Sequence, residues 1–169
     1  MRRVRAEVRG DLPPLRGTPL YRRSDFALSY DADALPSDTT TLDLAAALDR
    51  QFGLAPPDVF VIAETLTLTF SGRDGRLVSL DAYANEERWN RQSETRPSGP
   101  RGALLLTESI EDRFSLAITP EYRFDDRASM LFIGLGGRAS QHFEVGDDLF
   151  IGLVDGELAE VVLMNLRIE

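Results

Sequence analysis

The sequence predicts an α+β fold that is predominantly antiparallel β, with two related β-rich halves and one main helix near residues 41–52. Three observations predict it. Apolar and polar residues alternate with period two over most of the chain, which is typical of half-buried strands. A single segment instead carries apolar residues at helical spacing. Turn dipeptides such as Asp-Gly separate the alternating runs.

The N-terminal segment RRVRAEVRG alternates strictly, with Val4, Ala6 and Val8 on one face and charged residues on the other. This pattern predicts an edge strand whose charged face is solvated and discourages further pairing. A basic arm for nucleic acid or for an acidic partner is the functional alternative. A turn-rich stretch follows, and the next strand is expected at residues 25–30.

The segment TTTLDLAAALDRQFGLAPP predicts the one main helix. Thr40 can cap its N-terminus, and Leu44, Leu48 and Phe52 recur at helical spacing. Gly53 ends it, and the two prolines that follow prevent its continuation. We expect this helix to bury one apolar stripe against a sheet.

The segment 58–83 predicts a hairpin, because alternating leucines and threonines precede the turn SGRDG and a second strand follows it. Gly75 can take a positive φ in that turn. The apolar pattern is then lost, and prolines and glycines mark residues 91–102 as a linker. The chain is thereby divided into an α+β half, residues 1–90, and a β-rich half, residues 103–169. Two such halves bury more apolar surface as one globule or as a dimer than either does alone.

The second half is strand-like almost throughout, and its last hairpin resembles the hairpin of the first half. When Asp155-Gly156 is set over Asp74-Gly75, leucine meets leucine two residues later and both returning strands keep one apolar face. The match predicts that one hairpin was duplicated. Convergence of two unrelated hairpins is the alternative, because every hairpin shares period two.

The stretches YRFDDRASMLFIGL and FEVGDDLFIGLVDGELAEVVLMN resemble an uncharacterised family of small bacterial β-rich domains of unknown function. The resemblance covers about residues 120–166, with a weak second copy at about 60–85. It places Tyr122, the acidic turn that follows, Asp155-Gly156 and the VLMN ending where family members carry similar residues, although DDRAS departs from the commoner turn. The resemblance implies a small β-rich fold without catalytic residues and an antitoxin-like binding role.

The charge of the chain is unevenly distributed. Residues 1–23 carry a net charge of +5 and the remainder −14, which together give −9. Such an acidic body repels phosphate backbones, so it disfavours nucleic acid and suits a basic protein partner. The absence of cysteine excludes disulfides and thiol catalysis. Without a secretory signal or a membrane-length apolar run, a cytoplasmic protein is expected.

Few residues are candidates for catalysis. His142 is the only histidine, and no Gly-x-Ser-x-Gly motif accompanies it to suggest a catalytic triad. Carboxylates at Asp31, Asp33 and Asp125 could bind a divalent cation or serve in hydrolysis. Solvation of turns is the ordinary role of such acids in β proteins.

Arg88, Trp89 and Arg91 are the candidate partner contacts, because tryptophan and arginine are enriched in interface hot spots. The alternative is that Trp89 folds onto its own sheet as a lid. We therefore expect a non-catalytic protein-binding module, antitoxin-like or inhibitor-like, that uses no cofactor or metal. Its expected partner is another protein, of basic charge, or a second copy of the chain in a homodimer. A small carboxylate- or metal-dependent hydrolase is the alternative function.

Overall fold

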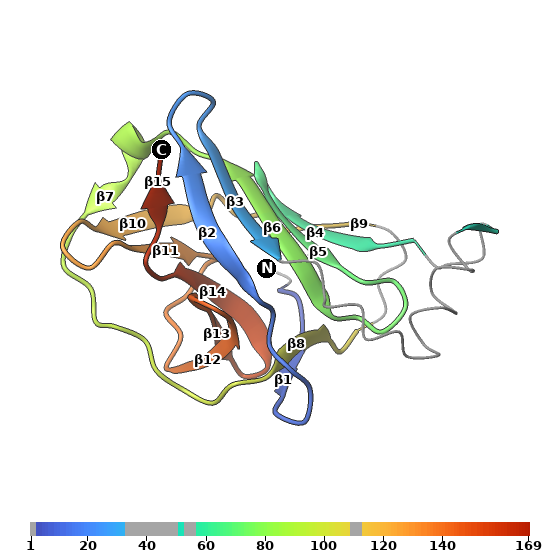
Figure 1. The fold of residues 1–169 in the computed structure, drawn as a ribbon. Helices are drawn as coiled ribbons and strands as arrows, with labels where there is room; N and C mark the ends of the chain where they lie inside the picture. The colour runs from blue at the N-terminus through green and yellow to red at the C-terminus, as the bar shows by residue number, and fades with distance from the viewer. Residues whose placement is uncertain (1–2, 33–50, 53–56, 109–112) are drawn as a thin grey trace.

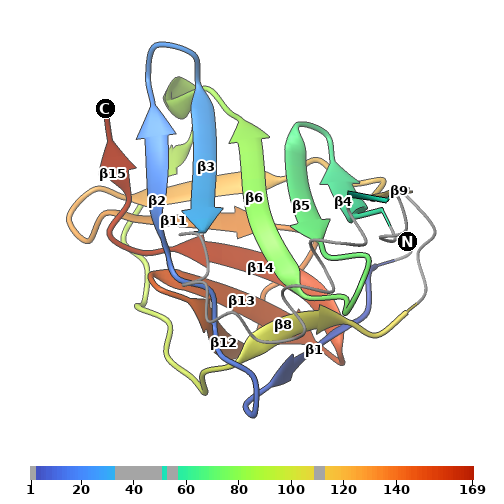
Figure 2. The same cartoon turned by 45° about the vertical axis from the view of Figure 1, so that its right-hand side comes forward.

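The computed structural model describes residues 3–32, 51–52, 57–108 and 113–169. In this part of the chain two large β-sheets pack face to face as a sandwich, and a two-stranded sheet covers one end of it (Figure 1). Figure 2 shows the strands of the seven-stranded sheet standing upright and those of the six-stranded sheet running across behind them. Crossed strands of this kind are typical of orthogonal sheet packing.

The seven-stranded sheet contains most of the first half of the chain. Its spatial order is β15 (Arg167–Ile168), β2 (Gly17–Arg22), β3 (Ala27–Ala32), β6 (Leu77–Tyr83), β5 (Leu66–Phe70), β4 (Val59–Ala63) and β9 (Arg113–Ser115). All neighbouring pairs are antiparallel except those of the two edge strands, β15 and β9. In β4 and β5 every second residue is buried, as the alternation predicts.

The six-stranded sheet is built mainly from the second half. Its spatial order is β12 (Gln141–Gly146), β13 (Leu149–Val154), β14 (Glu157–Leu163), β11 (Met130–Gly134), β10 (Glu121–Asp125) and β7 (Asn90–Arg91). Ile133 and Val161 face the core between the sheets, while Phe132 and Val162 belong to a second buried cluster on the opposite face. The centre of this sheet is therefore buried on both sides.

The N-terminal strand is confirmed as β1 (Ala6–Arg9), which pairs antiparallel with β8 (Ala103–Leu106). Val4 and Ala6 are buried, as their shared face predicts. Single bridges tie this small sheet to both large ones, since Arg5 pairs with Glu157 and Arg76 with Leu105.

Segments from both predicted halves contribute to each large sheet. Strands β9 and β15, from beyond the predicted linker, pair within the seven-stranded sheet, and β7, from its start, pairs within the six-stranded sheet. The segment 92–102 continues from β7 toward β12, where the amide of Glu144 donates to the carbonyl of Pro100 at 2.9 Å. We call this segment the strap.

The α+β prediction is wrong. Of the described residues, 54% are in strands and only 3% are helical, and the helical element among them is the 3₁₀ turn η1 (Glu86–Arg88). The core is closed by a second sheet rather than by a helix, so strand packing decides the fold class. Residues 33–50, which hold nearly all of the helix predicted near 41–52, lie outside the described residues, as do residues 53–56. Across the described ranges, no helix has the length and apolar character needed to cross a membrane.

The two hairpins that resemble each other in sequence share an irregularity. In one, Phe70 pairs with Leu77 across a β-bulge; in the other, Leu153 pairs with Leu158 across a bulge. When the Asp-Gly pairs are superposed, the two bulges coincide. Gly75 has a positive φ, as predicted, with a value of 77°, and its counterpart in the second hairpin, Gly156, has a φ of 76°. Duplication of a hairpin remains our proposal, and the shared bulge supports it.

Candidate functional site

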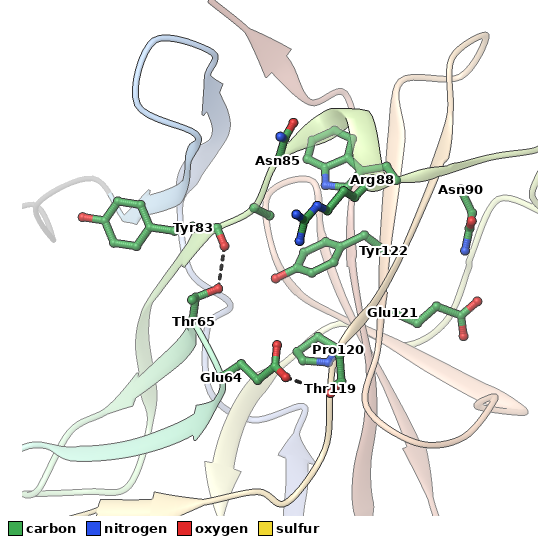
Figure 3. Close-up of a pocket in the computed structure, with 12 residues that line it drawn as sticks. Glu64, Thr65, Tyr83, Asn85, Arg88, Asn90, Thr119, Pro120, Glu121 and Tyr122 are labelled. Atoms are coloured by element: carbon green, nitrogen blue, oxygen red, sulfur yellow. Dashed lines mark hydrogen bonds between the residues drawn. The ribbon is translucent and has the colours of Figure 1, made fainter.

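An open pocket of about 520 Å³ lies at the end of the sandwich that carries η1 (Figure 3). Four segments form it: the β4–β5 turn, the end of β6, the turn η1 and the loop before β10. Its lining residues are Glu64, Thr65, Tyr83, Ala84, Asn85, Arg88, Trp89, Asn90, Thr119, Pro120, Glu121 and Tyr122. Both its volume and its mixture of aromatic and polar groups are typical of ligand sites.

Trp89 forms the floor of the pocket and joins the two sheets. Its side chain is buried, with the residue only 5% exposed. The ring centroid lies 4.8 Å from that of Tyr21 on β2, and 5.4 Å and 6.3 Å from those of Phe124 and Tyr122 on β10. Aromatic pairs at these separations attract one another beyond the area that they bury. The floor is therefore held from both sheets at once.

Hydrogen bonds fix the turn that positions Trp89 in the floor of the pocket. The Tyr21 hydroxyl donates to the carbonyl of Ala84 at 2.7 Å and accepts from the amide of Glu86 at 3.2 Å. The Asn85 side chain caps η1 by accepting from the amide of Glu87 at 3.0 Å. The end of β6 and the first residues of η1 are consequently anchored to β2.

Two buried polar atoms of the floor lack a hydrogen-bond partner among the described residues: Nε1 of Trp89 and the hydroxyl of Tyr122. Burial raises the pKa of Tyr122 to about 12, the charge of Glu64 adds to the rise, and the nearby Thr65 hydroxyl opposes it. That Thr65 hydroxyl donates instead to the carbonyl of Tyr83 at 2.5 Å. Buried polar atoms without a hydrogen-bond partner are rare in folded proteins, so these two atoms of the pocket require an explanation.

Charges of opposite sign face the pocket from opposite sides. Arg88 is exposed and forms no ion pair with any residue that the structure describes, and Figure 3 shows its guanidinium beside the ring of Tyr122. On the other side, Glu64 accepts a hydrogen bond from the Thr119 hydroxyl at 2.8 Å and makes no ion pair in the described part of the chain. Among the described lining residues, the pocket therefore presents one unpaired cation, Arg88, and two unpaired carboxylates, Glu64 and Glu121.

The three predicted partner contacts lie in different surroundings. Arg88 and Trp89 both line the pocket, Arg88 on its exposed side and Trp89 in its floor. Arg91 points elsewhere, because its guanidinium pairs with Asp126 at 2.5 Å and with Glu86 at 3.6 Å. It also lies 5.1 Å from the ring centroid of Phe124, against which it packs.

Two exposed aromatic residues belong to adjoining segments at the pocket, and one of them, Tyr83, lines it. Phe26, in the β2–β3 turn, is 48% exposed and Tyr83, at the end of β6, is 66% exposed. The two are neighbours, since Ala27 pairs with Tyr83 and the amide of Ala84 donates to the carbonyl of Phe26 at 3.0 Å. We call Phe26 and Tyr83 the aromatic rim. Sequence reasoning missed both, because Phe26 lies in a turn and Tyr83 ends its strand, and neither position indicates locally that an aromatic side chain is exposed.

His142 belongs to a buried network on the outer face of the six-stranded sheet, away from the pocket. Its Nε2 lies 2.8 Å from Oε1 of Glu160, whose Oε2 accepts from Arg123 at 3.2 Å. Arg123 also donates to Glu94 of the strap at 2.8 Å. The side chains of Arg123 and Glu160 are 6% and 4% exposed. The network thus ties the strap to the sheet.

The candidate carboxylates are not assembled into one site. Asp125 accepts from three backbone amides, those of Glu94, Arg127 and Ala128, at 2.9, 3.0 and 3.1 Å. These bonds hold the pKa of Asp125 below its usual range. Asp31 lies in β3, and Asp33 lies outside the described residues. Over the described ranges, no group of three or more His, Asp or Glu side chains is placed to hold a metal ion.

The scan of protein families finds no family whose model matches this chain, and the search of curated proteins finds no match. The resemblance to bacterial β-rich domains of unknown function therefore stays an expectation.

Proposed function

We propose that this protein is a non-catalytic protein-binding module that contacts its partner through the aromatic rim and the adjoining pocket. The observation that carries the proposal is that two exposed aromatic residues, Phe26 and Tyr83, lie on neighbouring backbone segments at an open pocket. Tyr83 and an unpaired arginine, Arg88, both line that pocket. Exposed apolar groups rimmed by polar residues are typical of protein interaction sites. Tyrosine and arginine are also among the residue types that dominate interface energies.

The rigidity of the surface supports this role. Trp89 and Tyr21 fix the turn behind the rim through ring packing and hydrogen bonds. Tyr83 is the last residue of the seven-residue strand β6. A surface that is ordered before binding loses less conformational entropy on association, which favours affinity.

The charge distribution favours a basic partner. The protein carries a net charge of −9. Around the pocket, Glu64, Glu87 and Glu121 form no ion pair with residues that the structure describes, and they outnumber the unpaired Arg88. Complementary charge accelerates encounter and excludes acidic partners, including a second copy of this chain. An antitoxin-like or inhibitor-like role in the cytoplasm, with a basic protein held by this surface, agrees with that balance.

The experiment is affinity capture from the source cells with the intact protein, followed by Kd measurements with the recovered partner. A stoichiometric partner is expected, and replacing the rim by the double variant Phe26→Ser/Tyr83→Ser is expected to weaken it at least about tenfold, as for hot-spot residues. Phe52→Ser is the matched control, since Phe52 is 68% exposed and lies outside the pocket. Equal weakening by both variants, or equal binding by the rim variant, contradicts the proposal.

A further inference from the structure

We infer that the pocket receives a carboxylate carried on a flat apolar body, with Arg88 and the indole N–H of Trp89 as its donors. The inference rests on the proposed function in taking the pocket as the recognition site, and it names the chemical group that enters. The carboxylate can belong to the end of a partner chain or to a free organic acid. The shared chemistry is the same in both cases.

Trp89 gives the strongest reason. Its residue is 5% exposed, it lines the pocket, and its Nε1 has no acceptor among the described residues. An indole N–H can only donate, so the group that would satisfy it must be an acceptor oxygen. Because a buried donor without a partner is costly, a ligand that supplies the acceptor recovers that cost on binding.

Arg88 defines the charge of that acceptor. It is the next residue along the chain, it is exposed, and it forms no ion pair in the part of the chain that the structure describes. A guanidinium binds a carboxylate through two parallel hydrogen bonds. Its side chain has no hydrogen-bond or ion-pair partner among the described residues, and it lines the same pocket as the indole.

The remaining lining explains the apolar body. The ring of Tyr122, the ring of Pro120 and the methyl group of Ala84 line the pocket, and Figure 3 shows the Tyr122 ring lying across its middle. The Tyr122 hydroxyl, which is also unpaired, offers a further donor. A flat apolar group against this ring would place its carboxylate toward Arg88.

Glu64 allows the sign of the ligand's charge to be tested. It faces the pocket from the side opposite Arg88, and its Oε1 is occupied by the hydroxyl of Thr119. A bound carboxylate is repelled by this charge, so Glu64→Gln should tighten its binding. A cationic ligand would instead lose its counter-charge, and the same substitution would weaken it.

The experiment follows the single indole N–H resonance of the intact protein, which Trp89 alone provides. Three probes share one ring and differ in charge: phenylacetate, phenylacetamide and phenethylammonium, each titrated at constant ionic strength. Phenylacetate is expected to move the indole resonance to saturation, and the amide to bind at least about tenfold more weakly, because charge-assisted hydrogen bonds are stronger. Phenethylammonium is expected to leave the resonance unchanged.

Variants locate the carboxylate. Arg88→Gln should weaken phenylacetate about tenfold, whereas the matched control Arg96→Gln, at an exposed position outside the pocket, should not change it. Glu64→Gln should tighten binding. Acetyl-Ala-Phe with a free C-terminal carboxylate, compared with its amide, separates the two sources: tighter binding than phenylacetate assigns a chain end, and weaker binding assigns a free organic acid.

Two outcomes overturn the inference. The first is an indole resonance that neither carboxylate moves, and the second is equal binding of phenylacetate and phenylacetamide. Either result leaves the proposed function intact if the rim variant still loses the captured partner. Conversely, if phenylacetate binds at Arg88 but the rim variant still binds the captured partner, the proposed function is refuted and the carboxylate site is retained.

Discussion

The indole of Trp89 lies nearly parallel to the phenol ring of Tyr122, with 6.3 Å between ring centroids and 15° between ring planes. Each ring ends in a buried polar atom that has no partner among the described residues. Trp89 also packs against Tyr21 of the seven-stranded sheet, which joins the two sheets, while the unpaired atoms of Trp89 and Tyr122 remain available to a ligand. One pair of side chains therefore serves both the stability of the fold and the candidate site.

The hydroxyls of two tyrosines in this cluster should differ in their value to stability. Tyr21→Phe removes a hydroxyl that bonds both Ala84 and Glu86, so the free energy of unfolding should fall by about 1–3 kcal/mol. Tyr122→Phe removes an unpaired hydroxyl, so the change should stay within about 0.5 kcal/mol or be stabilising. Urea denaturation at neutral pH measures both. A larger loss for Tyr122→Phe than for Tyr21→Phe would show that its hydroxyl is paired.

Alkaline pH should destabilise the protein through Tyr122. Burial raises the pKa of Tyr122 to about 12, above the ordinary value of 10. The folded state therefore holds this proton more tightly than the unfolded state, and the resulting stability is complete below pH 10 and is lost as the pH rises toward 12. Between pH 9 and pH 12 the free energy of unfolding, measured by denaturation at each pH, should fall less steeply with pH for Tyr122→Phe than for the wild type. Parallel curves would mean that the folded protein does not perturb this phenol.

Local patterns in the sequence predicted several strands but not what covers them, and they missed β2 in the turn-rich stretch. Alternation located β4 and β5, and the Asp-Gly turn correctly required a positive φ at Gly75. The partners of Trp89 could not be predicted, because Tyr21 and Tyr122 come from distant strands of different sheets. Contacts of this kind depend on how the two sheets cross, which no local period encodes.

The buried charges of the six-stranded sheet were hidden from sequence reasoning for a related reason. Arg123 occupies an alternate position that an antiparallel strand normally turns to water. The strap covers it, so the residue is only 5% exposed. The strap itself was predicted as a linker from its prolines and glycines, which mark irregular backbone without indicating what that backbone contacts.

Removal of Arg123 should be among the most destabilising single changes in the described structure. The guanidinium lies between Glu94, at 2.8 Å, and Glu160, at 3.2 Å, and 5.5 Å from the ring centroid of Phe132. Arg123→Met would leave the buried Glu160 and the largely buried Glu94 without this cation, and the free energy of unfolding should fall by about 3–5 kcal/mol. Arg96→Met, at an exposed arginine of the strap, is the control and should change it by less than about 0.5 kcal/mol. Similar effects of the two variants would show that the network contributes little.

The same variant should change the ionisation of Glu94. Burial raises the pKa of this carboxyl, but hydrogen bonds from Gln92 and Arg123 outweigh burial and hold the pKa below its usual range. Without the guanidinium, the effect of burial prevails and the pKa of Glu94 should rise. Carboxyl chemical shifts followed through a pH titration of the variant measure the change. An unaltered titration of Glu94 would contradict the assigned role of Arg123.

Acid should remove the contribution of Asp125. Three backbone amides hold the pKa of this carboxyl below its usual range. The stability that it contributes is therefore present above about pH 4 and is lost as the pH falls through the lower folded-state pKa. Asp125→Asn should be less stable than the wild type at pH 7, and the difference should shrink as the pH falls below about 4. A difference independent of pH would show that the charge of Asp125 is not what the amides recognise.

The strap should depend on the absence of a side chain at Gly99. A Cβ built at this position would collide with the carbonyl oxygen of His142 on β12. Two neighbouring bonds hold the backbone in place: the amide of Glu144 donates to the carbonyl of Pro100, and the amide of Gly102 donates to the carbonyl of Glu144. Gly99→Ala should therefore lower the free energy of unfolding by about 1–3 kcal/mol, the range for overpacking a fitted contact. It should also accelerate hydrogen exchange at the amide of Glu144, because that amide donates to the strap. Gly10→Ala is the matched control, since its Cβ would meet the carbonyl oxygen of Arg101 at an ordinary 3.6 Å. If both alanines have the same effect, the close approach at Gly99 does not hold the strap against β12, and the hydrogen bonds of the strap must fix it instead.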